Sequence, residues 1–304
     1  MLRPHLFSSD TAVINAVDAV TAPCTYHGEG AVWASWAPGQ PAALKFVDML
    51  AGDVLTLGLD GTVERDRVGT VAAALRPRAS GGFVVAIERG FLLVDAAGSR
   101  KQIDQLWSDA DVRMNDGGCD PDGRFYCGSM GTSDAGRASP AAGRVYRLDP
   151  DGTVTTVLDG LTIPNGFGFS PDGGTLYHVD TPTQHIYAYD YDRTRGLTNR
   201  RIVVAVPERH GHPDGLTVDA DGNLWVAMYG GGAVRNYTPA GRAGDVIAVP
   251  VSKVTSCAFG GPELDELYIT TSRENLPDDA EPAAGSVYRT TPGVRGLDAL
   301  PFGG

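Results

Sequence analysis

The feature of this sequence that most constrains its fold is a unit that recurs about every fifty residues. Three copies are clear: NDGGCDPDG from Asn115, NGFGFSPDG from Asn165 and DGLTVDADG from Asp214. In each copy an apolar segment leads into an Asp-Gly turn whose glycine lies eight positions after the first residue. Self-similarity at a fixed period is typical of repeat architectures.

Weaker copies extend the series to six units. They are GEGAVW with ALKFVDM, SGGFVVAIERG, and SCAFGGPELDELYITTS, while GRVYRLDPDG, HIYAYDYD and AVRNYTPAGR supply third and outer strands. Four short strands per unit of roughly 40 to 50 residues are typical of a propeller blade. We predict an all-β fold, a six-bladed β-propeller with four-stranded blades. A β-sandwich is less favoured because the whole strand and turn unit repeats.

The predicted propeller forms one domain over residues 1–304, with residues 1–20 as a candidate N-terminal extension. Within that extension, TAVINAVDAV is compatible with a short helix or an edge strand. Asp10, Asn15 and Asp18 interrupt any apolar run of signal-peptide length, so we predict a cytoplasmic protein. No stretch approaches the roughly 18 apolar residues of a membrane helix, so no membrane partner is expected.

Composition excludes several function classes. The chain has 37 acidic and 25 basic residues, a formal net charge of −12, which opposes nucleic-acid binding. The four cysteines are too sparse for a disulfide scaffold and lack the spacing of a zinc site. Neither a Gly-x-Ser-x-Gly elbow nor a nucleotide-binding glycine loop is present, so a serine-hydrolase or nucleotide mechanism has no motif to support it.

Propeller geometry gathers polar residues from different blades. The innermost strand of each blade begins at the central channel, so residues just ahead of equivalent strands face one axis. Applied here, that rule brings together Glu29, Asn115, Asn165, Asp214 and Ser256 at one mouth of the channel. Two close carboxylates repel, and a divalent cation relieves the repulsion. Oxygen ligands suit Ca²⁺, Mg²⁺ or Mn²⁺, and Zn²⁺ and Fe²⁺ also accept carboxylates.

A purely structural interpretation competes with this one. Asn165-Gly166 and Asp214-Gly215 are dipeptides typical of hairpin turns, where Asn or Asp serves its own backbone. Both dipeptides, however, follow a proline and precede a separate Asp-Gly turn by one strand. The shared offset favours side chains that are presented to the channel.

Five runs together resemble a known family: HGEGAVW, RMNDGGCDPDGRFYCGSM, IPNGFGFSPDGGTLYHVDT, PDGLTVDADGNLWVAMYGGG and TSCAFGGPELDELYITT. After about residue 20 the chain is similar to the gluconolactonase and senescence-marker-protein (regucalcin-like) family. The resemblance implies a six-bladed propeller with one divalent metal. It also implies hydrolysis of aldonolactones or, in some branches, of other esters and organophosphates.

The resemblance also assigns residues. Its metal ligands match Glu29, Asn165 and Asp214, with Asp214 also the general base, and its substrate-binding pair matches Arg113 and Asn115. The loop GTSDAGRASPAAG after Met130 lacks a clear match to an acidic residue that some members hold near the sugar hydroxyls. Asp134 is a weak candidate for that role.

We therefore predict a metal-dependent hydrolase, with Ca²⁺ as the preferred ion, that opens a small sugar lactone such as gluconolactone to the aldonic acid. Asp214 would take a proton from the attacking water, Arg113 would hold ring oxygens and Asn115 would donate to the carbonyl or ring oxygen. Asp116 and Asp180 are candidate orienting residues. Four histidines could also suggest a metal site, but we do not predict them as ligands: His27, His178, His210 and His212.

Two alternatives remain at this point. A metal-dependent phosphotriesterase or aryl esterase would use the same ligands with another pocket. A non-catalytic calcium-binding propeller would use the metal structurally. The sequence makes no prediction of oligomeric state.

Overall fold

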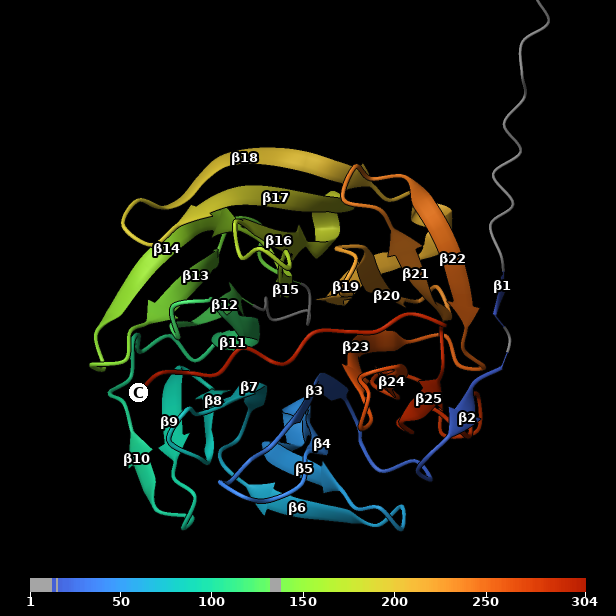
Figure 1. The fold of residues 1–304 in the computed structure, drawn as a ribbon, viewed down its shortest axis with the longest axis horizontal. Coiled ribbons are helices and arrows are strands. Elements are labelled where there is room, and N and C mark those ends of the chain that lie inside the picture. The colour runs from blue at the N-terminus through green and yellow to red at the C-terminus, as the bar shows by residue number, and fades with distance from the viewer. Residues whose placement is uncertain (1–12, 15, 132–137) are drawn as a thin grey trace, which may run out of the picture.

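Six small β-sheets surround a central axis, so the chain is the predicted six-bladed β-propeller (Figure 1). The structure is a computed structural model and describes residues 13, 14, 16–131 and 138–304. The innermost strands of neighbouring blades contact one another around the whole ring, in the order β3, β7, β11, β15, β19 and β23 and back to β3.

The first three blades each follow the chain outward from the channel. Blade 1 contains β3 (Gly28–Ala34), β4 (Ala43–Asp48), β5 (Asp53–Leu57) and β6 (Val63–Arg67). Blade 2 contains β7 (Ala72–Pro77), β8 (Phe83–Ile87), β9 (Gly90–Val94) and β10 (Arg100–Gln102). Blade 3 contains β11 (Val112–Cys119), β12 (Phe125–Gly131), β13 (Gly143–Leu148) and β14 (Val154–Leu161).

The last three blades repeat this plan, and the sixth is completed from the other end of the chain. Blade 4 contains β15 (Pro164–Phe169), β16 (Thr175–Asp180), β17 (His185–Asp192) and β18 (Gly196–Ala205). Blade 5 contains β19 (His212–Val218), β20 (Leu224–Tyr229), β21 (Ala233–Tyr237) and β22 (Ala243–Ala248). Blade 6 contains β23 (Val254–Gly260), β24 (Glu266–Thr271), β25 (Tyr288–Thr290) and β2 (Asp18–Ala19).

The N-terminal segment closes the ring. Asp18 and Ala19 pair antiparallel with Arg289 and Tyr288, so β2 is the outer strand of blade 6. The preceding β1 (Val13–Ile14) lies parallel to β22 on the outer edge of blade 5. Of the helix and edge-strand alternatives for this segment, the structure shows the strand. Three short 3₁₀ turns complete the elements: η1 (Met49–Ala51), η2 (Thr181–Thr183) and η3 (Glu208–His210).

A buried aspartate, Asp219, organises the predicted Asp-Gly turn of blade 5. In the β19–β20 turn, the Asp219 carboxylate accepts the backbone N–H groups of Asp221 and Asn223 at 3.0 and 2.8 Å. It also accepts the indole N–H of Trp225 at 2.9 Å. One side chain therefore satisfies the turn and fixes the start of the next strand, because aspartate bonds readily to backbone two residues on.

Apolar side chains pack chiefly between adjacent blades. Trp225 of blade 5 meets Phe259 of blade 6 edge-on, with ring centroids 6.1 Å apart, within the cluster shared by those two blades. Trp225, Tyr177 and Phe169 are all buried on strands of blades 4 and 5. Because each blade buries both faces against its neighbours, no blade has a complete core of its own.

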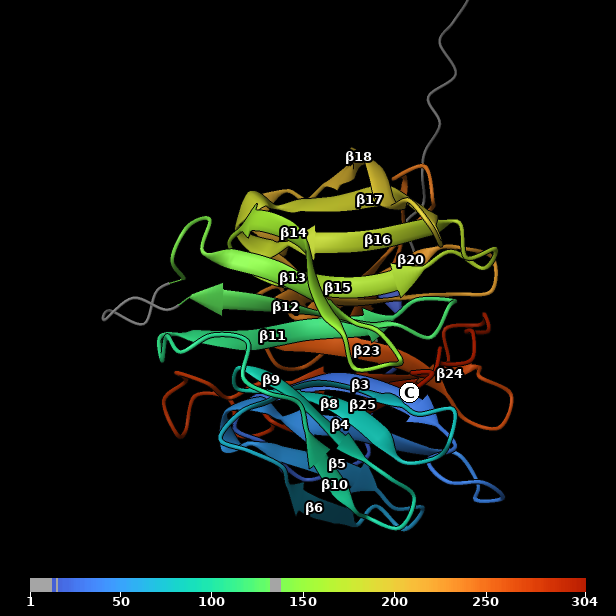
Figure 2. The same ribbon diagram turned by 90° about the vertical axis from the view of Figure 1, so that its left-hand side faces the viewer.

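The C-terminal segment crosses one face of the ring and ends beside blades 2 and 3 (Figure 1). Phe302 is buried there, and its backbone N–H donates to the Pro77 carbonyl at 2.7 Å. In the side view the C-terminus and the end of β12 lie on opposite faces of the disc (Figure 2). The C-terminal segment therefore covers the end of the channel that the innermost strands reach last.

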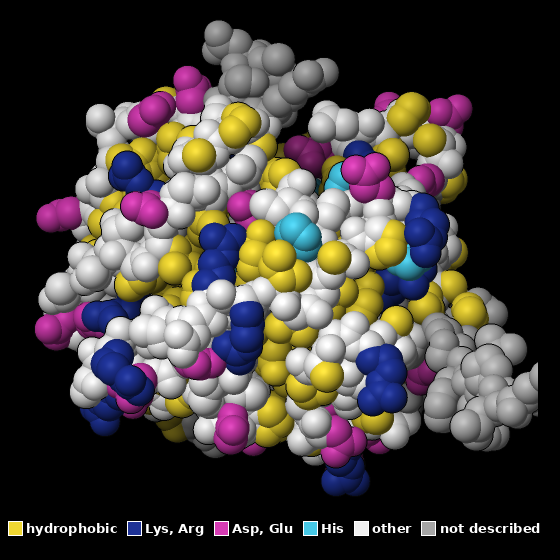
Figure 3. Space-filling model, turned by 90° about the horizontal axis from the view of Figure 1, so that it is seen from above, with side chains coloured by type: hydrophobic (Ala, Val, Ile, Leu, Met, Phe, Trp, Pro, Cys, Tyr) yellow, Lys and Arg dark blue, Asp and Glu magenta, His cyan; other side chains and the backbone are white. Residues whose placement is uncertain are grey.

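On the side in Figure 3, Lys and Arg side chains are scattered among acidic and neutral ones. Among the described residues, no helix is both long and apolar enough to span a bilayer.

Candidate metal and substrate site

A β-bulge interrupts the pairing of every innermost strand near the same end of the channel. In the three blades of the predicted metal site, register shifts fall between Glu29 and Val32, between Asn165 and Phe167, and between Pro213 and Leu216. A bulge re-aims side chains without ending the strand. The prediction that these residues lie just ahead of the innermost strands is therefore wrong. Asn165-Gly166 and Asp214-Gly215 both lie inside strands, at the bulges.

In blades 1 and 4, the glycine after the polar residue makes the bulge possible. Gly30 and Gly166 adopt φ of +58° and +52°, a left-handed conformation that residues with a Cβ rarely adopt. This local geometry explains why the chain repeats a polar residue followed by glycine in blades 1 and 4.

Glu29, Asn165 and Asp214 are 3, 5 and 5 % exposed on the innermost strands of blades 1, 4 and 5. Burial raises the pKa of Asp214 well above its usual range, and the Glu29 and Asp116 charges raise it further. Burial followed by the Asp116 charge likewise raises the pKa of Glu29. Among the described residues, no Lys or Arg forms an ion pair with either carboxylate.

These three side chains fit a divalent cation. Two buried carboxylates without a cationic partner are costly, and a bound cation offsets that cost. The carboxylate and carboxamide oxygens are hard donors of the kind that Ca²⁺ and Mg²⁺ prefer. No group of three His, Cys, Asp or Glu side chains with metal-binding geometry occurs in residues 16–131 or 138–304, so the amide of Asn165 would be an essential third donor.

A hydrogen-bond relay connects the predicted substrate residues to Asn165. Arg113 donates to Asn115 Oδ1 at 2.9 Å, and Asn115 Nδ2 donates to Asn165 Oδ1 at 3.0 Å. Asn165 Nδ2 in turn donates to Thr181 Oγ1 at 2.9 Å, and that hydroxyl donates to the Pro213 carbonyl at 2.8 Å. The relay joins blades 3, 4 and 5 and ends beside Asp214.

The relay changes what Asn115 can do in this conformation. Its Nδ2 also donates to the Pro164 carbonyl at 3.0 Å, so both amide hydrogens have protein partners. A hydrogen bond from Asn115 to a substrate would require one of them to be exchanged. The geometry gives Asn115 a positioning role toward Asn165, and its substrate contact stays a prediction.

Asp116 and Asp180 orient the backbone beside Asn165. Asp116 accepts the N–H of Gly166 at 2.8 Å, which fixes the blade 4 bulge from blade 3. Asp180 accepts the N–H of Ile163 at 2.9 Å, just ahead of β15. Asp48 does the same for His27 ahead of β3, at 3.0 Å. Sequence reasoning missed Asp48, although FVD and HVD close equivalent strands of blades 1 and 4.

A family model described as SMP-30/Gluconolactonase/LRE-like region matches residues 27–273. The chain belongs to this family. The predicted resemblance is thus confirmed.

Several relatives have named activities or ligands. A pentonolactonase from Haloferax volcanii is 37% identical over 275 residues, which are 86% of this chain and 89% of that protein. A regucalcin from Danio rerio is 32% identical over 91% of this chain and 95% of its own. A solved calcium-binding protein, regucalcin, from Agrobacterium tumefaciens is 29% identical with a TM-score of 0.86, covering 96 and 99% of the two chains. A gluconolactonase from Xanthomonas campestris gives a TM-score of 0.68 at 25% identity, covering 90 and 89%.

In this member of the SMP-30/gluconolactonase family, the four histidines that we did not assign as metal ligands lie in different environments. His178 is fully buried against Phe167, with Nδ1 3.3 Å from the Gly166 carbonyl, and burial lowers its pKa to about 4. Burial also lowers the pKa of His27 to about 3, and its Nδ1 lies 2.8 Å from Ser272 Oγ. His212 begins β19 and is exposed, while His210 ends η3.

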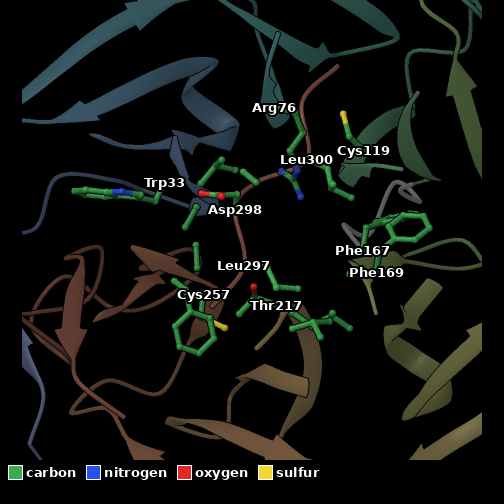
Figure 4. A pocket seen from close by; sticks show the side chains of 18 of the residues that line it. Trp33, Arg76, Cys119, Phe167, Phe169, Thr217, Cys257, Leu297, Asp298 and Leu300 are labelled. Carbon is green, nitrogen blue, oxygen red and sulfur yellow. The ribbon is translucent and has the colours of Figure 1, made fainter. Parts of the chain in front are cut away.

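A cavity of about 460 Å³ lies in the channel on the C-terminal side of this constellation. Arg76, Cys119 and Phe167 line it beneath the C-terminal residues Leu297, Asp298 and Leu300 (Figure 4). Asp116 and Ser256 also line it, whereas Glu29, Asn165, Asp214 and Arg113 do not. Asp134, the weak sugar-binding candidate in the loop after Met130, lies outside the described residues.

Sequence reasoning also missed Glu274, which follows β24 at the mouth. Its Oε2 lies 3.5 Å from His27 Nδ1. Burial lowers the pKa of Arg113, while Glu274 is the foremost of the charges that raise it. No repeat motif marks Glu274, because it lies in a blade-specific segment between β24 and β25.

Proposed function

We propose that this chain is a metal-dependent hydrolase that opens a small sugar lactone, such as gluconolactone, to the aldonic acid. The observation that supports the proposal is the burial of Glu29, Asn165 and Asp214 at the bulges of three innermost strands. Among the described residues, neither carboxylate has a cationic ion-pair partner. The names of the pentonolactonase and gluconolactonase relatives support the substrate class.

Glu29, Asn165 and Asp214 would hold the metal, and Ca²⁺ is the ion we propose because all three donors are oxygens. A relative described as calcium-binding supports the same choice. When bound, the ion would polarise the lactone carbonyl and offset the negative charge that develops on its oxygen.

The chain's own residues supply binding and proton transfer. The Asp214 carboxylate would take the proton of the water that attacks the carbonyl carbon. The C–O bond of the ring then breaks, and the ring oxygen leaves as the hydroxyl of the open acid with the proton that Asp214 took from the water. Arg113 would hold ring oxygens with its fixed fork of donors, while Asn115 and Asp116 keep Asn165 in position.

Chelation followed by re-addition of single metals tests this function. Enzyme-dependent acid release from glucono-δ-lactone should disappear after exhaustive chelation and return with Ca²⁺ or with one of Mg²⁺, Mn²⁺, Zn²⁺ and Fe²⁺. Full activity in protein that holds no metal by elemental analysis would remove the metal mechanism.

A phosphotriester and an aryl ester assayed in parallel separate the alternative hydrolases. A higher kcat/KM on either of them than on the lactone would replace the lactonase assignment. Calcium binding without turnover of any of these substrates would indicate a non-catalytic calcium-binding propeller.

A further inference from the structure

The side chain of Glu274 stands between two blades at the mouth of the channel. Its carboxylate lies 3.5 Å from the ring of His27, which precedes β3 of blade 1. Its carbonyl oxygen accepts from Lys253, whose ammonium faces the ring of Tyr229 at the end of β20 in blade 5. Its own backbone belongs to blade 6, after β24. The carboxylate therefore lies on the side of the mouth where Glu29 and Asp214 begin their bulges.

Contacts from neighbouring segments fix this position. The Lys253 ammonium donates to the Glu274 carbonyl oxygen and lies 5.2 Å from the centre of the Tyr229 ring. The Glu274 N–H donates to Ser272 Oγ at 3.0 Å, and the Ser272 N–H donates to the Lys253 carbonyl at 3.0 Å. Glu274 is thus held by its main chain, and its carboxylate does not need an ion pair to stay in place.

The carboxylate remains open to the mouth. The side chain is 27% exposed, unlike Glu29 and Asp214. Burial lowers the pKa of Arg113, and the negative charge of Glu274 acts against that shift. A carboxylate has about four acceptor sites. A donor fork on Arg113 and free acceptors on Glu274 therefore share one mouth.

We propose that Glu274 determines specificity by accepting hydrogen bonds from the ring hydroxyl groups of the substrate, while Arg113 donates to its oxygens. This inference rests on the proposed lactonase function and narrows its substrate class to polyhydroxylated lactones. An unsubstituted lactone offers no donor, so binding it would desolvate Glu274 without compensation, and such sites discriminate strongly against analogues that lack a hydroxyl.

The Glu274→Gln variant tests the proposal with two six-membered lactones that differ in their hydroxyls, glucono-δ-lactone and δ-valerolactone. We expect kcat/KM on the hydroxylated lactone to fall about 10- to 100-fold, the usual range for a hydrogen bond to a charged group. On δ-valerolactone it should not fall, because that lactone makes no hydrogen bond to Glu274 that the change could remove. Ca²⁺ affinity, measured by calorimetry, should be unchanged.

Glu263→Gln is the matched control. Glu263 lies on the turn at the other end of the β23–β24 hairpin and is 63% exposed, so this change removes the same charge away from the mouth. It should leave both lactones unaffected. Equal losses on the two lactones in Glu274→Gln, or a tenfold loss of Ca²⁺ affinity, would overturn the specificity role.

Failure of the proposed function has a different outcome. Wild-type protein that hydrolyses neither lactone would overturn the function itself. The role of Glu274 is then decided by calorimetry with the ring-opened acids gluconate and 5-hydroxyvalerate, which carry one carboxylate each. Stronger binding of gluconate that Glu274→Gln abolishes would support the role, and equal binding of both acids would refute it.

Discussion

Asp214 combines two properties that make it sensitive to loss of charge. It is buried beside Glu29, and that surrounding raises its pKa, so the ionised form is both basic and costly. Asp214→Asn keeps the shape of the side chain but removes the charge and the base. We expect kcat on glucono-δ-lactone to fall about 10² to 10⁴-fold, the usual effect of losing a general base.

The same variant should change stability in the opposite direction. A raised carboxyl pKa means that the fold disfavours the ionised form above that pKa, so metal-free Asp214→Asn should melt at a higher temperature than metal-free wild type. Asp221→Asn, an exposed aspartate in the β19–β20 turn, is the control and should change neither property. Near-wild-type kcat at saturating metal in folded Asp214→Asn would leave Asp214 with a structural role only.

His178 gives the fold a defined pH dependence. Its pKa is about 4 in the folded protein and about 6.5 in an unfolded chain, so only the unfolded state gains a proton as the pH falls between these values. Its contribution is therefore intact above pH 6.5 and is lost on acidification, by about 2 kcal/mol between pH 7.5 and 5.0. Urea unfolding at both pH values measures it. His178→Gln should show that much less acid destabilisation, and identical pH slopes would contradict the assignment.

At the residue scale, the sequence predicted which polar residues form the site, but it did not predict which residues they contact. Glu29, Asn165 and Asp214 recur at equivalent blade positions, so the repeat alone groups them. The relay from Arg113 through Asn115 to Thr181 depends on distances between blades, and nothing in the repeat specifies them. Glu274 lies outside the repeat, so only the folded ring reveals it.

At the scale of elements, the bulges are what convert a repeat into a site. The sequence predicted that Asn165-Gly166 presents its side chain, but a two-residue turn and a bulge have the same dipeptide preference. Pairing on both sides of the bulge is non-local: Asn165 pairs with Val179 and Phe167 with His178. The local pattern therefore predicts a polar residue with glycine, and strand register decides which structure forms.

Gly166→Ala tests the importance of the blade 4 bulge. A Cβ there would lie 2.8 Å from Leu216 Cδ2 and 3.1 Å from the Asp214 carbonyl, at a φ of +52°. The added carbon should displace β19 at Asp214 as well as strain β15. We expect Ca²⁺ affinity to fall at least tenfold, measured by calorimetry, together with a loss of thermal stability.

Gly196→Ala is the control that separates displacement of β19 from backbone strain. Gly196 begins β18 in the same blade, has a φ of +72°, and a Cβ there would meet nothing within 4 Å. It should lose roughly 1 kcal/mol of stability from the left-handed conformation alone, with unchanged Ca²⁺ affinity. Equal Ca²⁺ affinities in the two variants would show that the bulge does not position the ligands.

At the scale of the whole molecule, six similar units predict the ring, but not how its ends are covered. β2 completes blade 6 from the N-terminal side, through a segment whose sequence allowed either a helix or a strand. The C-terminal segment carries no repeat motif, yet it bonds to blades 2 and 3 and lines the channel cavity. The C-terminal segment lies opposite the mouth, so we expect it to stabilise the fold without taking part in the chemistry of the site.

Phe302→Ala tests that separation. Phe302 is 1% exposed in the cluster shared by blades 2 and 3, so truncation should cost about 3 to 5 kcal/mol and lower the melting temperature by on the order of 10 °C. Its backbone bonds to Pro77 and Ala79 do not involve the ring, so the segment should stay in place. Leu297→Ala, in the same segment but 38% exposed, should cost much less stability.

At 25 °C both variants should keep wild-type kcat and KM on the lactone, because the mouth lies at the other end of the channel. A Phe302→Ala protein that melts normally but loses activity would instead connect the C-terminal segment to the site.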